Sequence, residues 1–170
     1  TVSPARSPSD LAMRSALAAH DKILHAAIED HGGFLFKHTG DGVCAAFASP
    51  RSAVDAAVAA QRALELPVRM GLATGEAELR DGDYFGAVLN RAARVMAAGH
   101  GGQVLLAEAT ADLLSGLDLL DLGPPRLRDG PTPGGEFQVR APGLRGEFLP
   151  FRRVGPDRGD VRPETPSLVG

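Results

Sequence analysis

The sequence has a single cysteine, Cys44, and no apolar run long enough to cross a membrane. One cysteine excludes an internal disulfide framework and fits a reducing compartment. A membrane-spanning helix needs about 20 apolar residues in a row, and residues 1–20 have no apolar segment of the signal-peptide type. These absences predict a soluble, cytoplasmic domain without a membrane partner.

An excess of basic charge is also missing. The net charge is −3 and the isoelectric point is near 5.9, which argues against non-specific nucleic-acid binding. None of the five histidines has zinc-ligand spacing. With 170 residues and a hydrophobic fraction of 44%, the chain fits one globular domain with a sizeable core.

Apolar periodicity and turn residues divide the chain into alternating helices and strands. A first helix is expected from Asp10 to His31, with one apolar face made of Met13, Ala16, Leu17, Leu24, Ala27 and Ile28. The further expected elements are a hairpin at 34–47, a helix from Pro50 that Pro67 closes, strands at 68–74 and 77–79, a helix at 87–98, a strand at 103–107, a helix at 109–115, and strands at 117–122 and 136–140. This order predicts an α+β fold, with helices on one face of a sheet.

The same pattern sets the expected limits of the domain. Residues 1–9 contain two prolines and little that could pack, so we interpret them as an irregular lead-in. The domain itself is expected over residues 10–150. Residues 151–170 are rich in Pro, Gly and Arg, which predicts a linker or a disordered tail.

The hairpin at residues 34–47 has apolar runs on both sides of a polar tip, Lys37 to Gly42. Asp41-Gly42 is a strong turn signal, because hairpin turns need residues that tolerate positive φ. A purely structural turn therefore explains the pattern. Lys37 and Asp41, four residues apart, could also hold a phosphate ester and a metal ion.

A second informative segment covers residues 83–94. In a helix that begins near Ala87, Asn90 and Arg94 lie four residues apart and share one face. A solvated polar face is the alternative interpretation, although Asn and Arg at this spacing gain little helix stability from each other.

Together, the two segments resemble the catalytic signature of the class III nucleotidyl cyclases. The residues that carry this resemblance are Lys37-x-x-Gly40-Asp41, followed by Asp83-x-Phe85-Gly86-x-x-x-Asn90-x-x-x-Arg94. The similarity covers roughly residues 10–150. It implies a ferredoxin-like βαββαβ core, a head-to-tail dimer with active sites between two cyclase subunits, and conversion of ATP to cyclic AMP and pyrophosphate in intracellular signalling.

The resemblance also implies a role for each matching residue. Asp41 would bind Mg²⁺ or Mn²⁺, and Lys37 and Asp83 of the other subunit would bind adenine. Asn90 would orient the ribose, and Arg94 would stabilise charge on the α-phosphate. The basic residue for the terminal phosphates is expected near Arg126 or Arg128 and is not assigned.

One part of the family pattern is missing. Cyclases carry their first metal-binding Asp on an opening strand, which would lie upstream of Thr1, and residues 1–9 contain no equivalent. Because that strand is central in the sheet, its absence predicts unpaired backbone edges in the core. We therefore expect weak or no cyclase activity from this chain alone. The alternative is a catalytically impaired, cyclase-like module for nucleotide binding, dimerisation or regulation.

Two shorter matches remain. Residues 161–170 resemble the segment that joins such domains to an ATPase module in bacterial LuxR-type regulators, which suggests a piece of a larger signalling protein. Gly134-Gly135-Glu136-Phe137 is similar to the diguanylate cyclase signature. It is one residue short and sits in a Pro-rich loop near the end of the domain, so we reject the diguanylate cyclase interpretation.

Overall fold

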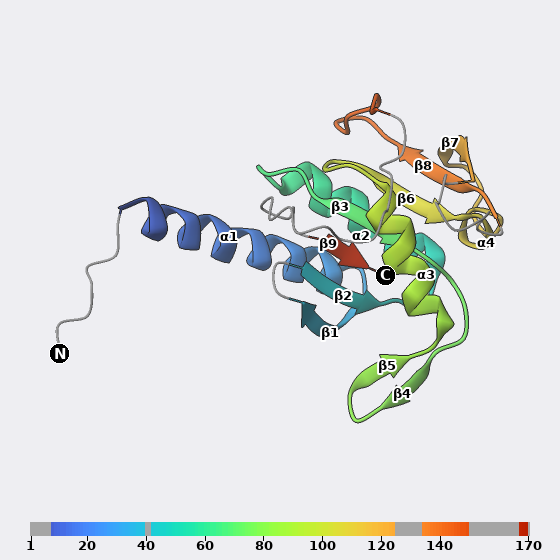
Figure 1. Ribbon diagram of the computed structural model, residues 1–170, viewed down its shortest axis with the longest axis horizontal. Coiled ribbons are helices and arrows are strands. Elements are labelled where there is room, and N and C mark those ends of the chain that lie inside the picture. The colour runs from blue at the N-terminus through green and yellow to red at the C-terminus, as the bar shows by residue number, and fades with distance from the viewer. Residues whose placement is uncertain (1–7, 40–41, 125–133, 150–166, 170) are drawn as a thin grey trace, which may run out of the picture.

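The computed structural model describes residues 8–39, 42–124, 134–149 and 167–169 (Figure 1). Its elements follow the predicted order, with two strands that were not predicted, one directly after the Asp81-Gly82 turn and one at the end. They are α1 (Pro8–Asp30), β1 (Phe34–Thr39), β2 (Gly42–Ala46), α2 (Pro50–Ala63), β3 (Arg69–Leu72), β4 (Glu78–Arg80), β5 (Asp83–Phe85), α3 (Ala87–Ala98), β6 (Val104–Ala107), α4 (Glu108–Ala111), β7 (Asp118–Gly123), β8 (Glu136–Arg140) and β9 (Ser167–Val169). No helix in these ranges is long and apolar enough to cross a membrane.

Most strands belong to one seven-stranded sheet with the order β1-β2-β9-β3-β6-β8-β7. β1 and β2 form the predicted antiparallel hairpin, and β9 runs parallel to both β2 and β3. β4 and β5 form a separate two-stranded arm that projects from the body (Figure 1). Asp81 and Gly82 have positive φ angles of 49° and 78°, as the tight turn between these two strands requires.

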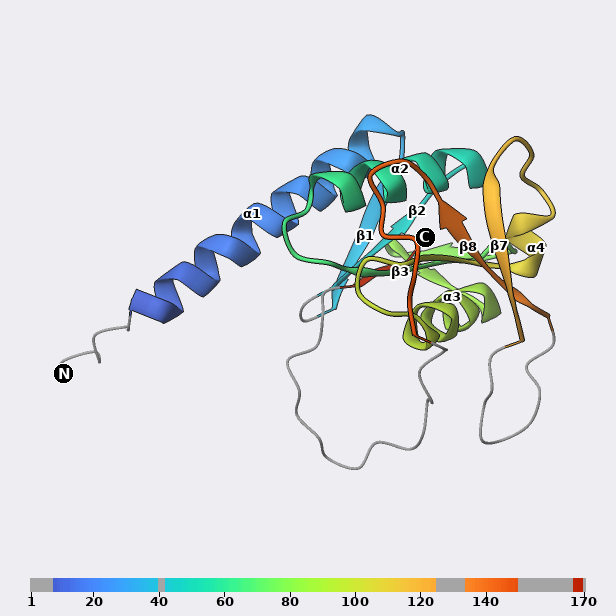
Figure 2. The ribbon, with the colours of Figure 1, turned by 90° about the horizontal axis from the view of Figure 1, so that it is seen from above.

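Helices cover both faces of the sheet, with α1 and α2 on one face and α3 on the other (Figure 2). On the first face Val104 and Leu106 of β6 join the core with Leu24 and Val54; on the opposite face Leu105 packs with Val95 of α3. The prediction of helices on one face is therefore right for α1 and α2 and wrong for α3. The physical reason is that β6 is apolar at every position and must be covered on both faces.

The long first helix is buried only in its C-terminal half. Leu24, Ala27 and Ile28 lie in the core, as predicted, but Met13 and Leu17 are 60% and 40% exposed. The prediction of one continuous buried face is wrong for these two residues. Figure 2 shows the reason, because the N-terminal half of α1 extends beyond the sheet and no other helix or strand of the described residues lies beside it.

The C-terminal segment differs from the prediction as well. Residues 151–170 were expected to be a linker or a disordered tail, yet Ser167–Val169 form β9 in the centre of the sheet. β9 pairs with Val43 and Cys44 on one side and with residues 69–71 on the other. The expectation of unpaired central edges is therefore wrong over the length of β9.

Helix α3 approaches the sheet most closely at Gly71 of β3. A Cβ atom at this position would lie 2.5 Å from the backbone nitrogen of Met96 and 2.7 Å from the carbonyl oxygen of Ala92. Backbone atoms of a packed helix cannot move aside cheaply, so only glycine fits. Gly71 therefore sets the distance between α3 and the sheet.

We expect Gly71→Ala to lower the free energy of unfolding by about 1–3 kcal/mol, because the added methyl group overpacks the contact with α3. Urea denaturation followed by circular dichroism measures this change. Gly146→Ala is the matched control, since nothing lies within 4 Å of a Cβ atom there. Equal stability of the two variants would show that α3 can shift at no cost.

Candidate functional site

The β1–β2 hairpin places Lys37 differently from the expectation. β1 continues to Thr39, so Lys37 lies within a strand and not in the polar tip. Lys37 is exposed and is directly opposite Cys44 of β2, next to a bulge between Leu35 and Lys37. Asp41 lies outside the described residues.

The β4–β5 arm carries Asp83 to the same region. Asp83 is the first residue of β5 and is half-buried, and its carboxylate accepts a hydrogen bond from the Tyr84 backbone N–H at 2.9 Å. The next side chain, Tyr84, meets Phe36 of β1 in an edge-to-face contact with ring centroids 5.0 Å apart. This contact fixes the arm against β1, close to Lys37.

Lys37 and Asp83 both affect the pKa of the Cys44 thiol. Burial raises the pKa of Cys44, the Lys37 ammonium lowers it, and the Asp83 carboxylate raises it. Both charges therefore act on the same side chain, although they come from segments more than 40 residues apart in the sequence. The structure brings together Lys37, Cys44 and Asp83, from β1, β2 and β5.

Asn90 and Arg94 lie on α3 and are both exposed. The helix buries Ala92, Val95 and Ala98 against the sheet, which leaves its other side open to solvent. Among the described residues no side-chain hydrogen bond or ion pair involves Asn90 or Arg94, or joins them to Lys37 or Asp83. Their shared site with Lys37 and Asp83 therefore remains a prediction.

The described residues do not form a complete metal site by themselves. No three His, Cys, Asp or Glu side chains come together among them. The predicted metal ligand, Asp41, falls at residues 40–41, outside the described ranges, and so do Arg126 and Arg128. The assignment of a metal to Asp41 stays a prediction.

Sequence reasoning missed three residues of this region: Phe36, Cys44 and Tyr84. Counting back from a two-residue turn at positions 40–41 would have placed Cys44 opposite Lys37. The contact between Phe36 and Tyr84 joins two hairpins that are far apart in the sequence, so no local pattern signals it.

Glu136, which belongs to the rejected diguanylate cyclase signature, is a buried residue of the sheet. It lies in β8 opposite Ala107, is only 4% exposed, and its Oε2 atom has no hydrogen-bond partner among the described residues. Burial raises its pKa from 4.5 to about 7. A buried strand residue of this kind fits the interpretation that the motif is unrelated to catalysis.

The Glu136 pKa makes stability depend on pH. Between pH 4.5 and 7 the folded chain keeps a proton that the unfolded chain has released, so stability falls as the pH rises through this range. Above pH 7 Glu136 is ionised in the folded state too. Its buried charge then lowers the free energy of unfolding by up to about 3 kcal/mol. We expect Glu136→Gln to be more stable than the parent at pH 8 and equal to it near pH 4, as measured by urea denaturation.

Glu65→Gln, at an exposed position, is the control for Glu136→Gln. This variant should show the same pH dependence of the free energy of unfolding as the parent. A parallel pH dependence in the parent and in Glu136→Gln would contradict the assignment of the buried proton.

The charges around Cys44 can be tested by alkylation. We expect Lys37→Gln to move the midpoint of the pH profile for iodoacetamide labelling upward, and Asp83→Asn to move it downward, since thiolate is the reactive form. The midpoint of the profile depends on the thiol pKa, whereas easier access of iodoacetamide to the thiol changes the labelling rate at every pH. Lys22→Gln on the exposed surface of α1 should leave it in place; if Lys37→Gln does too, the two groups are not neighbours.

Comparison with known proteins shows that the fold is similar to that of cyclase domains. No family model matches the sequence. The chain is 40% identical over 154 residues to an uncharacterized protein of Mycobacterium tuberculosis strain H37Rv, an alignment that covers 85% of this chain and 53% of the relative. It is 32% identical over 121 residues to "Putative adenylate cyclase 3" of Rhizobium meliloti, covering 63% of this chain and 21% of that protein.

Among solved structures, the chain is similar to the adenylate cyclases of Trypanosoma brucei in their monomeric state. The TM-score is 0.68 at 25% sequence identity, over 84% of this chain and 86% of that structure. The chain spans about half the length of the first curated relatives that it matches.

Proposed function

We propose that this chain, which has the fold of class III adenylate/guanylate cyclase domains, binds ATP and contributes to its conversion to cyclic AMP and pyrophosphate. In that reaction the ribose 3′-hydroxyl attacks the α-phosphate in line. Little covalent chemistry falls to the protein, which must position the nucleotide and stabilise charge.

The observation that carries the proposal is the placement of Lys37 and Asp83 around Cys44. A cation and an anion from separate hairpins lie within reach of one thiol, as a pair that recognises one base would require. The Lys37 ammonium would donate to adenine N1, and the Asp83 carboxylate would accept from the 6-amino group. Guanine presents the opposite donor and acceptor at these edges, so the pair favours ATP over GTP.

Asn90 and Arg94 are the proposed catalytic residues on α3. Asn90 would orient the ribose, and the Arg94 guanidinium would stabilise negative charge on the α-phosphate. Their exposure is compatible with a site completed by a second subunit, and we propose a head-to-tail homodimer on this basis.

Mg²⁺ or Mn²⁺ is the proposed cofactor, with Asp41 as a ligand. When bound, such an ion would stabilise charge on the reacting oxygens. The resemblance calls for a second metal-binding carboxylate, and residues 1–9 contain no equivalent of it, so we propose that this chain alone turns over weakly or not at all. A non-catalytic module for nucleotide binding, dimerisation or regulation is the second candidate, favoured by the same missing carboxylate.

We expect Lys37→Ala and Asp83→Ala each to weaken binding of a fluorescent ATP analogue by about 10–100-fold, the loss expected for one hydrogen bond to a charged group. Both changes should also reduce the preference for ATP over GTP in competition. Lys22→Ala is the matched control and should bind like the parent. Unchanged discrimination between ATP and GTP would show that Lys37 and Asp83 do not recognise the base.

Turnover is tested separately, by measuring cyclic AMP formed from ATP with Mn²⁺. We expect little or no product from this chain while nucleotide binding persists. Turnover that Asp41→Ala or Arg94→Ala abolishes, but Arg91→Ala on the same helix does not, would show that the site is complete and refute the expected weakness. If ATP does not bind at all, the catalytic proposal and the nucleotide-binding form of the second candidate both fail.

A further inference from the structure

The bulge in β1 changes the direction of one side chain next to Lys37. Lys37 is opposite Cys44 of β2, and the register shifts between Leu35 and Lys37, so Phe36 is the extra residue of the bulge. Successive side chains of a regular strand point to opposite faces of the sheet, and a bulge interrupts this alternation. Phe36 meets Tyr84 of the β4–β5 arm. The bulge therefore lets Phe36 face the arm beside Lys37.

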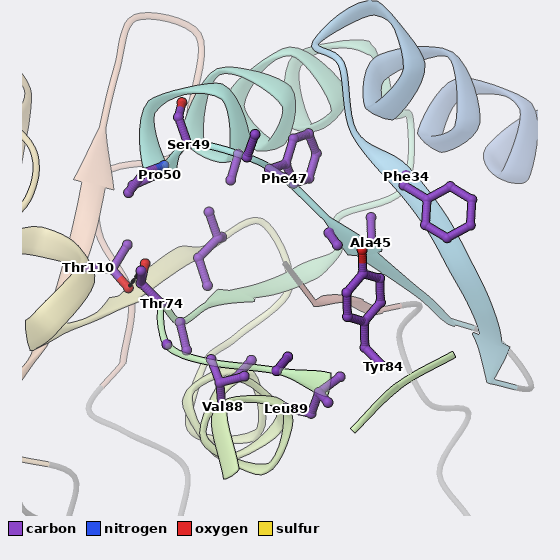
Figure 3. A pocket seen from close by; sticks show the side chains of 18 of the residues that line it. Phe34, Ala45, Phe47, Ser49, Pro50, Thr74, Tyr84, Val88, Leu89 and Thr110 are labelled. Atoms are coloured by element: carbon purple, nitrogen blue, oxygen red, sulfur yellow. Dashed lines mark hydrogen bonds between the residues drawn. The ribbon is translucent and has the colours of Figure 1, made fainter. Parts of the chain in front are cut away.

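β5 presents a matching pair of consecutive residues, Asp83 and Tyr84. The Tyr84 ring lies edge-to-face against Phe36, with ring centroids 5.0 Å apart and 65° between the ring planes. Asp83 and Lys37 both act on the Cys44 thiol. Figure 3 shows the Tyr84 side chain pointing from the arm toward β2, the strand that carries Cys44. β1 therefore meets β5 through an aromatic pair that lies beside a charged pair.

The β4–β5 arm is held against β1 by side chains and not by a hydrogen-bond ladder. Within the described part of the chain, β4 and β5 pair with each other and form a sheet separate from the main one. A two-stranded ribbon is marginally stable unless it packs against something else. The contact between Phe36 and Tyr84 supplies such packing. Loss of either ring should therefore free the arm to move relative to β1.

The Asp83 carboxylate is oriented by the same arm residue. Its Oδ1 atom accepts the hydrogen bond of 2.9 Å from the Tyr84 backbone N–H. No hydrogen bond to Oδ2 joins it to another described residue, so Oδ2 can accept from the 6-amino group of adenine. The ring that meets Phe36 and the N–H that orients the carboxylate thus belong to one residue, Tyr84.

We propose that Phe36 and Tyr84 are positioning residues for base recognition, because their contact holds the Asp83 carboxylate where it and the Lys37 ammonium reach one adenine edge. This inference rests on the proposed function, since without nucleotide binding there is no base to recognise. Phe36 and Tyr84 act through Asp83 and set how strongly ATP is preferred over GTP.

The first test needs no nucleotide and uses the pH profile of iodoacetamide labelling at Cys44 in the full chain. Asp83→Asn is expected to move the midpoint of this profile downward. We expect Tyr84→Ala to move it downward as well, because Asp83 can then leave the thiol, and to add no shift in an Asp83→Asn background. No shift, or an equal shift in both backgrounds, would overturn the proposal, since Tyr84 would then at most cover the thiol.

The second test measures competition of ATP and GTP against a fluorescent ATP analogue. We expect Tyr84→Ala and Phe36→Ala each to reduce the preference for ATP over GTP about ten-fold, near the lower limit for loss of a hydrogen bond to a charged group. This ratio does not depend on the folded fraction, because unfolded chain lowers the apparent affinity for both nucleotides equally. In an Asp83→Ala background, Tyr84→Ala should not change the ratio further.

Three further variants separate positioning from general damage. Tyr84→Phe keeps the ring, and the Tyr84 hydroxyl has no hydrogen bond to another described residue, so this variant should behave like the parent. Phe34→Ala removes a 51% exposed ring from the same strand as Phe36 and should also behave like the parent. If Tyr84→Ala does not fold, Tyr84→Leu keeps an apolar side chain in place and should still lose part of the preference.

The outcomes distinguish this inference from the proposed function. If the parent prefers ATP over GTP and Tyr84→Ala keeps that preference, the proposed function stands and the positioning role is refuted. If the parent does not prefer ATP, base recognition by Lys37 and Asp83 fails, and the positioning role fails with it. A loss in Tyr84→Phe or Phe34→Ala as large as in Tyr84→Ala would also overturn the proposal, because the ring contact would not be the cause.

Discussion

Backbone pairing in the middle of the sheet is the constraint on which the rest of this structure depends. β2 and β3 are connected through α2 and run in the same direction, but they are not hydrogen-bonded to each other, because β9 lies between them. Buried N–H and C=O groups must find partners. The two halves of the sheet, β1-β2 and β3-β6-β8-β7, are therefore joined through three residues from the far end of the sequence.

The opposite face of the sheet explains why α3 can present Asn90 and Arg94. Close contact at Gly71 seats the helix on β3, and the contacts of Val95 with Leu105 hold its inner side. A helix seated in this way presents a fixed outer face, and both predicted residues are exposed on it. The presentation of Asn90 and Arg94 to solvent therefore depends on packing at Gly71, Val95 and Leu105.

Much of the fold could be predicted from local patterns, and the exceptions have long-range causes. Helix caps and apolar periodicity located the helices and strands from α1 to β8 to within a few residues, except β5, for which no strand was predicted after the Asp81-Gly82 turn. β9 was missed because the three residues that follow Pro166 are too few to show a period. Met13 and Leu17 follow the right spacing, but burial needs a surface to pack on, and the sheet does not reach that far.

The candidate site also combines features that could be predicted from the sequence with features that depend on long-range contacts. Lys37 and Asp83 were paired through resemblance to a family and not through any local rule, and the placement of both near Cys44 is what the folded chain adds. The bulge beside Lys37 and the contact of Phe36 with Tyr84 could not be read from the sequence, because each depends on how two hairpins meet. Asp41 lies outside the described residues, so the metal-binding part of the site rests on the resemblance.

β2 links the two regions of the molecule. Cys44 is opposite Lys37 on the β1 side and opposite Val169 on the β9 side, so one residue separates the proposed base-binding cation from the central strand of the sheet. Neighbouring strands in a sheet share their twist and register. The pairing of β2 with β9 therefore helps to fix the β1–β2 hairpin that carries Lys37.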